Sequence, residues 1–133
     1  MTAACRESCC SVDPRLTVDE LFARGFRRNR EAPLSVEGAP CKDAAGNLAR
    51  FSLDVKAGKV VRVGFRVSTC ATLIAYSELL AEMLPGARIE LAREMSPESL
   101  VAALPGVPPL KHDRAGLAIA AFRTALAEVN DCA

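Results

Sequence analysis

The chain has 133 residues and a formal net charge of +1, with half of its residues hydrophobic and a quarter charged. These values predict one globular domain, and the near-neutral charge argues against nucleic acid or an anionic membrane surface as a partner. No apolar run reaches the length of a membrane span, and the N-terminus lacks the basic-then-apolar pattern of a secretory signal. We therefore expect a cytoplasmic protein whose four arginines between positions 24 and 30 form a solvated surface.

Three of the six cysteines, Cys5, Cys9 and Cys10, fall among small and polar residues without apolar periodicity. Residues 1–14 are therefore predicted to be a disordered tail, and residues 15–133 a single domain. The aliphatic content is high enough to build a core without disulfide bonds, so we expect reduced thiols. The C-x3-C-C spacing could bind a soft metal, but we interpret these cysteines, and Cys132, as adventitious.

The first structured element is predicted to be a short helix that begins at Thr17. Glu20, three residues later, completes a capping box with this threonine. The apolar side of the helix comprises Val18, Leu21, Phe22 and Phe26. Residues 33–36 then read as a brief edge strand that ends at Gly38.

An antiparallel hairpin is the clearest local signal. Apolar and polar residues alternate from position 50 to 56 and again from 61 to 67, with Ala57 and Gly58 as the turn between them. The expected apolar face comprises Phe51, Leu53, Val55, Val61, Val63, Phe65 and Val67. One face of the hairpin should therefore be buried and the other wet.

Helices follow the hairpin. One is expected from about Cys70 to the stop at Pro85, a second is capped by Ser96 with Pro97 at its first position, and a long final helix follows residue 111. The apolar positions of the first and last of them are Leu73, Tyr76, Leu80, Met83, Ile119, Phe122, Leu126 and Val129. Strands followed by helices predict an α+β fold, with a three-stranded antiparallel sheet and helices packed on one face.

Two cysteines stand in local contexts that favour chemistry. Cys41 follows a Gly-Ala-Pro segment and shares a loop with Asp43, and Cys70 stands where a strand passes into a helix. A helix N-terminus stabilises a thiolate, which is the nucleophilic and metal-binding form of cysteine. The alternatives are that Cys41 is a turn residue without a role and that Cys70 is a small core residue.

Three segments, in the right order, resemble motifs of the IscU/NifU N-terminal-type scaffold proteins of iron–sulfur cluster assembly. Residues 38–43 (GAPCKD) resemble the family's G-A-P-x-C-G-D loop, with one residue missing and Lys42 in place of glycine. Residues 65–77 (FRVSTCATLIAYS) resemble R-F-K-T-x-G-C-G-S-A-I-A-S-S, and residues 107–111 (VPPLK) resemble L-P-P-V-K. The resemblance runs from about Arg27 to Val129.

The resemblance implies a cluster or metal site made by Cys41, Asp43 and Cys70. Just beyond L-P-P-V-K the family has a histidine and then its third cysteine, and here those positions hold Asp113 and Arg114. The third thiol is therefore missing, and Arg114 should lie near the thiolates, where it stabilises them and can pair with Asp43.

His112 and Asp113 are further candidate metal ligands at the start of the final helix. His112 could complete a tetrahedral zinc site, but it is shifted by one residue from the family's histidine, so we slightly favour an exposed, non-ligating side chain. For Asp113, a role as a helix cap and a role as a ligand are equally supported.

We interpret the chain as a non-enzymatic iron–sulfur assembly protein that binds iron, a labile [2Fe–2S] cluster or zinc, as a monomer or weak dimer. The resemblance implies two partners: a cysteine desulfurase, and an Hsp70-type chaperone that would recognise Val107, Pro108, Pro109, Leu110 and Lys111. The alternative is a degenerate relative that regulates one of these partners. A cysteine hydrolase or thiol oxidoreductase using Cys70 and His112 ranks last, because no C-x-x-C pair or orienting acid supports it.

Overall fold

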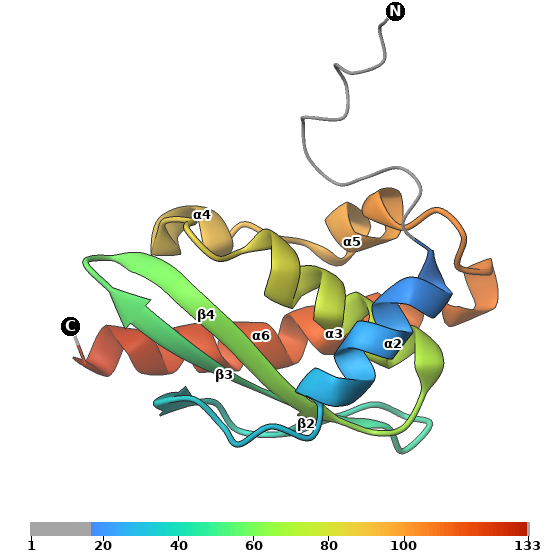
Figure 1. Cartoon of the computed structure of the whole chain (residues 1–133), viewed down its shortest axis with the longest axis horizontal. Helices are drawn as coiled ribbons and strands as arrows, with labels where there is room; N and C mark the ends of the chain where they lie inside the picture. Colours follow the sequence, from blue (N-terminus) through green and yellow to red (C-terminus); the bar gives the residue numbers. More distant parts are fainter. Residues whose placement is uncertain (1–16, 133) are drawn as a thin grey trace, which may run out of the picture.

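A curved antiparallel sheet and two long helices form the centre of the molecule (Figure 1). The computed structural model describes residues 17–132, with side chains to residue 129. Strand β3 pairs with β4 along one edge and with β1 and then β2 along the other. The strands are β1 (Val36–Glu37), β2 (Cys41–Lys42), β3 (Leu48–Lys56) and β4 (Lys59–Val67). The predicted α+β class is confirmed, and the strand count is four because residues 38–40 interrupt the edge strand.

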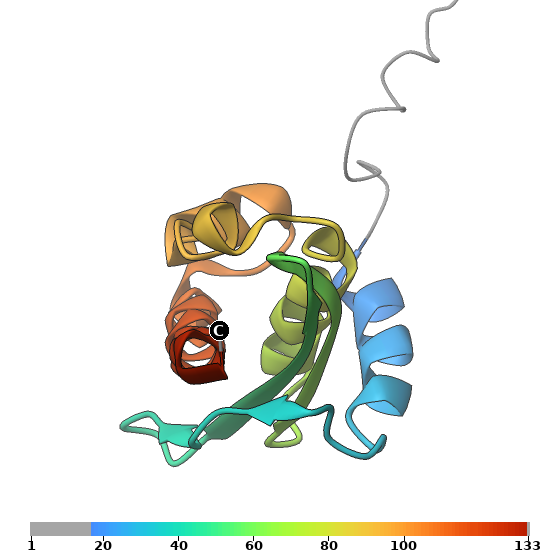
Figure 2. The ribbon, with the colours of Figure 1, turned by 90° about the vertical axis from the view of Figure 1, so that its left-hand side faces the viewer.

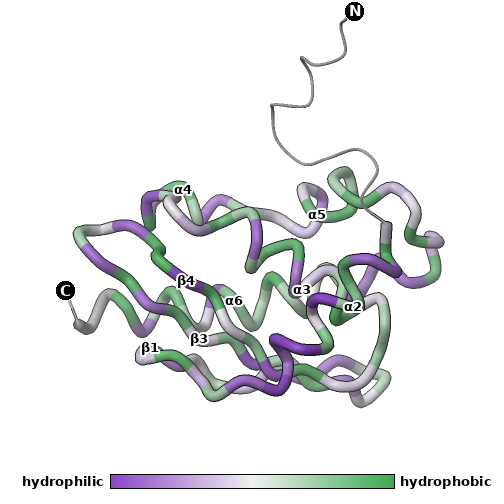
Figure 3. The backbone as a smooth tube through the Cα atoms, in the orientation of Figure 1, coloured by the Kyte–Doolittle hydropathy of each residue, from purple (hydrophilic) through white to green (hydrophobic). Residues whose placement is uncertain are grey.

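The β3–β4 hairpin turns at Ala57 and Gly58, whose φ angles of 55° and 76° are typical of a type I′ turn. A register shift beside this turn pairs Val55 with Val60. As a result Val60 is buried and Val61 is 45 % exposed, so the prediction that Val61 faces the core was wrong. Beyond the shift, the alternation of apolar and polar residues follows the prediction (Figure 3).

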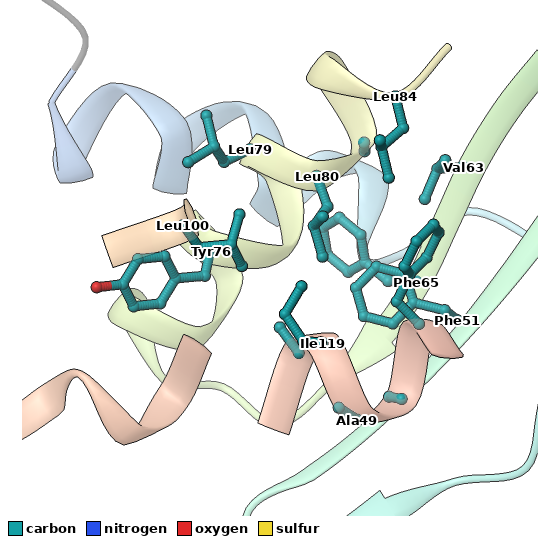
Figure 4. Close-up of a cluster of buried hydrophobic side chains, with 14 of the residues drawn as sticks. Ala49, Phe51, Val63, Phe65, Tyr76, Leu79, Leu80, Leu84, Leu100 and Ile119 are labelled. Atoms are coloured by element: carbon teal, nitrogen blue, oxygen red, sulfur yellow. The ribbon is translucent and has the colours of Figure 1, made fainter. Parts of the chain in front are cut away.

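The core lies between the sheet and helices α3 (Ala71–Met83) and α6 (Asp113–Cys132). Figure 2 shows α6 end-on, within the curve of the sheet. Three buried aromatic rings meet at the centre: Phe51 lies 5.7 Å from Phe65 and 5.9 Å from Phe122, measured between ring centroids. Leu80 of α3 packs over them (Figure 4). Four predicted core positions of α6 are all buried: Ile119, Phe122, Leu126 and Val129.

Helix α2 (Val18–Arg28) packs along α3. The predicted capping box is present, because the Thr17 hydroxyl accepts from the Glu20 amide and the Glu20 carboxylate accepts from the Thr17 amide. Leu21 is fully buried, as expected. Phe26 lies on the exposed side instead, with the Arg30 guanidinium 5.9 Å from its ring centroid.

The C-terminal end of α2 also covers the free edge of β4. The Asn29 side chain accepts from the Val67 amide at 2.8 Å and donates to the Val67 carbonyl at 3.0 Å. The Arg28 guanidinium donates to the Val63 carbonyl at 3.4 Å and to both oxygens of the buried Glu78 carboxylate, at 2.7 and 3.1 Å. These bonds fix α2 to both the sheet and α3.

Short helices complete the chain between α3 and α6: α4 (Ile89–Ala92), α5 (Pro97–Ala103) and the 3₁₀ turn η1 (Pro109–Lys111). Ser96 caps α5, as predicted. None of the helices that the structure describes has the length and hydrophobicity needed to cross a membrane. The predicted tail, with its three cysteines, and the Cys132 side chain lie outside the described residues.

Candidate functional site

Cys41 lies on the short strand β2, opposite Ala49 of β3. Ala49 in turn pairs with Val67 of β4. Cys41 therefore lies in the same row of the sheet as Val67, and Val67 precedes Cys70 by three residues. Gly38 allows this strand to approach α6, since a Cβ at this position would lie 2.6 Å from the Ala125 nitrogen. The Cys41 side chain is half-buried and its thiol is free.

Asp43 organises the turn that follows β2. Its Oδ1 accepts from the amides of Ala45 and Asn47, at 3.0 and 2.9 Å, and its Oδ2 accepts from the Asn47 side chain at 3.1 Å. Gly46 supplies the positive φ of 89° that the turn requires. Hydrogen bonds from Asn47 are the main reason that the pKa of Asp43 is lowered, with a smaller contribution from the Arg114 charge.

Cys70 is the N-terminal cap residue of α3, as the sequence predicted. Burial acts to raise the pKa of this half-buried thiol. The backbone amides of Leu73 and Thr72, and the hydrogen bond and charge of Arg114, together outweigh burial. The pKa of Cys70 is therefore lowered, which favours the thiolate.

Arg114, in the first turn of α6, connects the candidate residues. Its guanidinium donates to the Asp113 carboxylate at 2.8 Å and lies close enough to Cys70 to lower the pKa of that thiol. The side chain is only 17 % exposed, and its charge also acts on Asp43. From the resemblance we expected Arg114 to lie near the thiolates, where it can pair with Asp43. In the structure its ion pair is with Asp113 instead.

His112 and Asp113 are held by local contacts. The His112 Nε2 lies 3.0 Å from the Val107 carbonyl, and since a carbonyl only accepts, Nε2 carries the proton. In the neutral ring, Nδ1 is then the nitrogen with a free lone pair. Asp113 is the first residue of α6, and its exposed carboxylate pairs with Arg114.

The structure thus pairs the Arg114 guanidinium with Asp113 and places it close enough to Cys70 and Asp43 to lower the pKa of both. It does not hold them as a preformed metal site: among the side chains described, those of residues 17–129, no group of three or more His, Cys, Asp or Glu is placed to bind a metal ion. Sequence reasoning did not identify Asn47 as the partner of Asp43, although Asp43, Gly46 and Asn47 are residue types typical of turns. It also missed the closeness of Gly38 to α6, for which the sequence carried no signal.

A family model described as the NifU-like N-terminal domain matches residues 24–131. The chain belongs to this family. The match includes every candidate ligand and the segment from Val107 to Lys111, and it confirms the resemblance to iron–sulfur cluster assembly scaffolds.

Among curated proteins, the chain is similar to the iron–sulfur cluster assembly scaffold proteins IscU 1 and IscU 2 of Archaeoglobus fulgidus. It is 31 % identical to each over 83 residues, which cover 62 % of this chain and 54 % of the relative. The chain therefore spans about half the length of these relatives.

Two solved structures share the fold. The N-terminal domain of a nitrogen-fixing NifU-like protein from Brucella abortus superposes with a TM-score of 0.59 at 15 % identity, covering 88 % of this chain and all of that one. A crystal structure of a hypothetical protein superposes with a TM-score of 0.53 at 16 % identity, covering 82 % and 98 % of the two chains. At these identities the likeness extends to the fold alone.

Proposed function

We propose that this protein is a non-enzymatic, cytoplasmic member of an iron–sulfur cluster assembly system that holds iron or a labile [2Fe–2S] cluster as its cargo. Cys41, Asp43 and Cys70 would bind the cargo, and zinc is the alternative metal. The observation that carries this proposal is the position of Arg114, whose guanidinium acts to lower the pKa of both Cys70 and Asp43. The start of α3, the start of α6 and the turn that contains Asp43 are therefore close enough for one cation to act on both Cys70 and Asp43.

The donor set has the chemistry that such cargo requires. Both described thiols are free, and thiolates are the soft ligands that iron–sulfur clusters and zinc prefer. The lowered pKa of Cys70 increases its thiolate fraction at neutral pH. A carboxylate is a weaker and more exchangeable ligand, which suits a protein that must release what it holds.

Loading requires local rearrangement, because both Asp43 oxygens are already bonded within their turn. The Arg114 guanidinium, which acts on both Cys70 and Asp43, must likewise move aside. Once the guanidinium moves, two thiolates and one carboxylate leave a fourth ligand position open. His112 through Nδ1, or Asp113, would fill it from the start of α6.

The proposed partners are a cysteine desulfurase, which would supply sulfur, and an Hsp70-type chaperone. The chaperone would bind Val107, Pro108, Pro109, Leu110 and Lys111. In this segment Leu110 is 91 % exposed, so it is available to an apolar pocket of a partner.

Anaerobic reconstitution with iron and sulfide tests the cargo proposal, with metal analysis and visible absorption as the measurements. The wild type should bind metal and show thiolate-to-iron absorption, and Cys41→Ser and Cys70→Ser should each lose most of it. Cys132→Ser is the matched control and should behave as the wild type. Equal metal content in all three variants would refute the assigned ligands.

Arg114 allows a sharper test of the missing thiol. Arg114→Cys should raise the yield of [2Fe–2S] species, because it adds a soft ligand at the start of α6. Arg114→Ala removes the cation without adding a ligand, so it separates the two effects. Equal cluster yield in both variants would mean that the cation, rather than the absent sulfur, limits assembly.

A second function is favoured by one observation: no group of three or more candidate ligands is assembled among the described residues. In that case the chain would be a degenerate scaffold that regulates a desulfurase or chaperone without carrying cargo. It would then bind neither iron nor zinc, and its addition would change the turnover of a cysteine desulfurase. Metal-free protein that leaves desulfurase and Hsp70 rates unchanged would exclude this function too.

A further inference from the structure

A hollow of about 240 Å³ opens on the face of β3 and β4 that points away from α3 and α6, beside the C-terminal end of α2. Its floor includes Ser52 and Gly64, which are Cα partners in the sheet. A Cβ at position 64 would lie 3.0 Å from the Ser52 hydroxyl and 3.5 Å from the Leu34 side chain. The space above Gly64 is therefore already filled by the side chains of Ser52 and Leu34. Four arginines line the hollow: Arg28, Arg50, Arg62 and Arg66.

Two of these arginines are already bonded to well-placed carboxyl groups. Arg28 binds both oxygens of Glu78. Arg62 donates twice to Asp54 Oδ2, at 3.1 and 3.3 Å. The remaining positive charge on the wall therefore comes from Arg50 and Arg66.

Arg50 and Arg66 stand directly opposite each other on the paired strands. Like charges in this arrangement destabilise a sheet unless something compensates them. Arg50 has a weak compensating pair, because Glu37 lies 3.3 Å from its Nε and both side chains are substantially exposed. Arg66 donates to the backbone carbonyl of Glu31 at 3.1 Å, and no carboxylate of the described residues pairs with it.

The terminal amino groups of the Arg50 and Arg66 guanidiniums are suited to binding one anion between them. A guanidinium binds a carboxylate through two parallel N–H bonds, and such charge-assisted bonds are about twice as strong as neutral ones. Glu31 and Glu37 also line the hollow, so its net charge is small. A singly charged carboxylate group meets less repulsion there than a phosphate dianion does.

We propose that the hollow binds a small carboxylate-bearing molecule between Arg50 and Arg66. The ligand's carboxylate lies across the two guanidinium groups, and the rest of the molecule extends into the hollow beside Leu34, which covers Ser52 and Gly64. The site is on the sheet face opposite the core, so it does not depend on cargo at Cys41 and Cys70.

NMR titration of the metal-free, full-length protein with acetate, succinate and inorganic phosphate, at constant ionic strength, tests this proposal. Acetate and succinate should shift the amide signals of residues 50–52 and 64–66 saturably, with dissociation constants on the order of 1–10 mM. Phosphate should bind more weakly. Tighter binding of phosphate, or no saturable shift with either carboxylate, would overturn the proposal.

Variants separate a specific site from general charge attraction. Arg66→Gln should weaken binding about tenfold or more, because it removes a charge-assisted partner. Arg88→Gln removes the same charge from an exposed residue outside the hollow and should leave binding unchanged. Equal weakening in both variants, or none in Arg66→Gln, would contradict the assignment. Arg66 is exposed, so its replacement should not prevent folding.

Discussion

Replacing Gly38 by alanine should destabilise the protein by about 1–4 kcal/mol. The new Cβ would lie 2.6 Å from the Ala125 nitrogen and 2.8 Å from its Cα, well inside the ordinary contact distance of about 3.5–4.0 Å. These atoms belong to the α6 backbone, which cannot turn aside as a side chain can. Overpacking of this kind costs about 1–3 kcal/mol, and loss of the bond from the Thr124 hydroxyl to the Ala39 carbonyl adds about 1 kcal/mol. Alanine also lowers the conformational entropy of the unfolded chain, which offsets the destabilisation by about 0.4–1 kcal/mol.

Urea unfolding followed by circular dichroism measures this difference. Gly116→Ala is the matched control, since Gly116 lies in α6 and a Cβ added there would meet no neighbouring atom within 4 Å. That change should stabilise the protein by about 0.5–1 kcal/mol, because alanine favours a helix over glycine. The two identical substitutions should therefore act with opposite sign. A neutral or stabilising Gly38→Ala would show that β2 is not pressed against α6.

Three further predictions concern the core, a buried carboxylate and the site. Phe65→Ala and Leu80→Ala should each destabilise by about 2–5 kcal/mol in urea unfolding, and a loss below about 1 kcal/mol would place these side chains outside the core. Burial raises the pKa of Glu78 from 4.5 to about 7, so the folded state holds a proton that the unfolded chain releases. Stability should therefore fall as the pH rises from about 4.5 to about 7, and Glu78→Gln should reduce this pH dependence in thermal melts. An unchanged pH dependence would exclude Glu78 as its source. Arg114→Ala should slow alkylation of Cys70 at neutral pH by lowering its thiolate fraction, and an unchanged rate would contradict their contact.

The elements governed by local periodicity were predictable. The capping box at Thr17, the cap at Ser96 and the alternation along most of residues 50–56 and 62–67 depend on neighbours within a few residues, and the structure contains them. Val61 escaped prediction because a register shift next to a tight turn moves the burial pattern by one residue. Phe26 escaped prediction because α2 packs mainly on α3, which leaves the far side of α2 in solvent.

The candidate site was predictable only in outline. Motif spacing predicted Cys41, Asp43 and Cys70 as ligands and Arg114 as a neighbour of the thiolates, and the structure places Arg114 close enough to act on Cys70 and Asp43. Which groups Asp43 binds could not be foreseen, because its turn competes with any metal for the same two oxygens. The ion pair of Asp113 with Arg114, rather than of Asp43 with Arg114, likewise depends on side-chain geometry that spacing does not contain.

The bonds from Arg28 and Asn29 to β4 have a consequence for self-association. An uncovered strand edge is a template for pairing with another chain, and β4 is nine residues long with a regular run of apolar side chains. The end of helix α2 therefore blocks intermolecular pairing at the β4 edge, in addition to holding the sheet against α3. A shortened protein that begins after Asn29 would expose the carbonyls of Val63 and Val67 and the amide of Val67, and should aggregate through this edge.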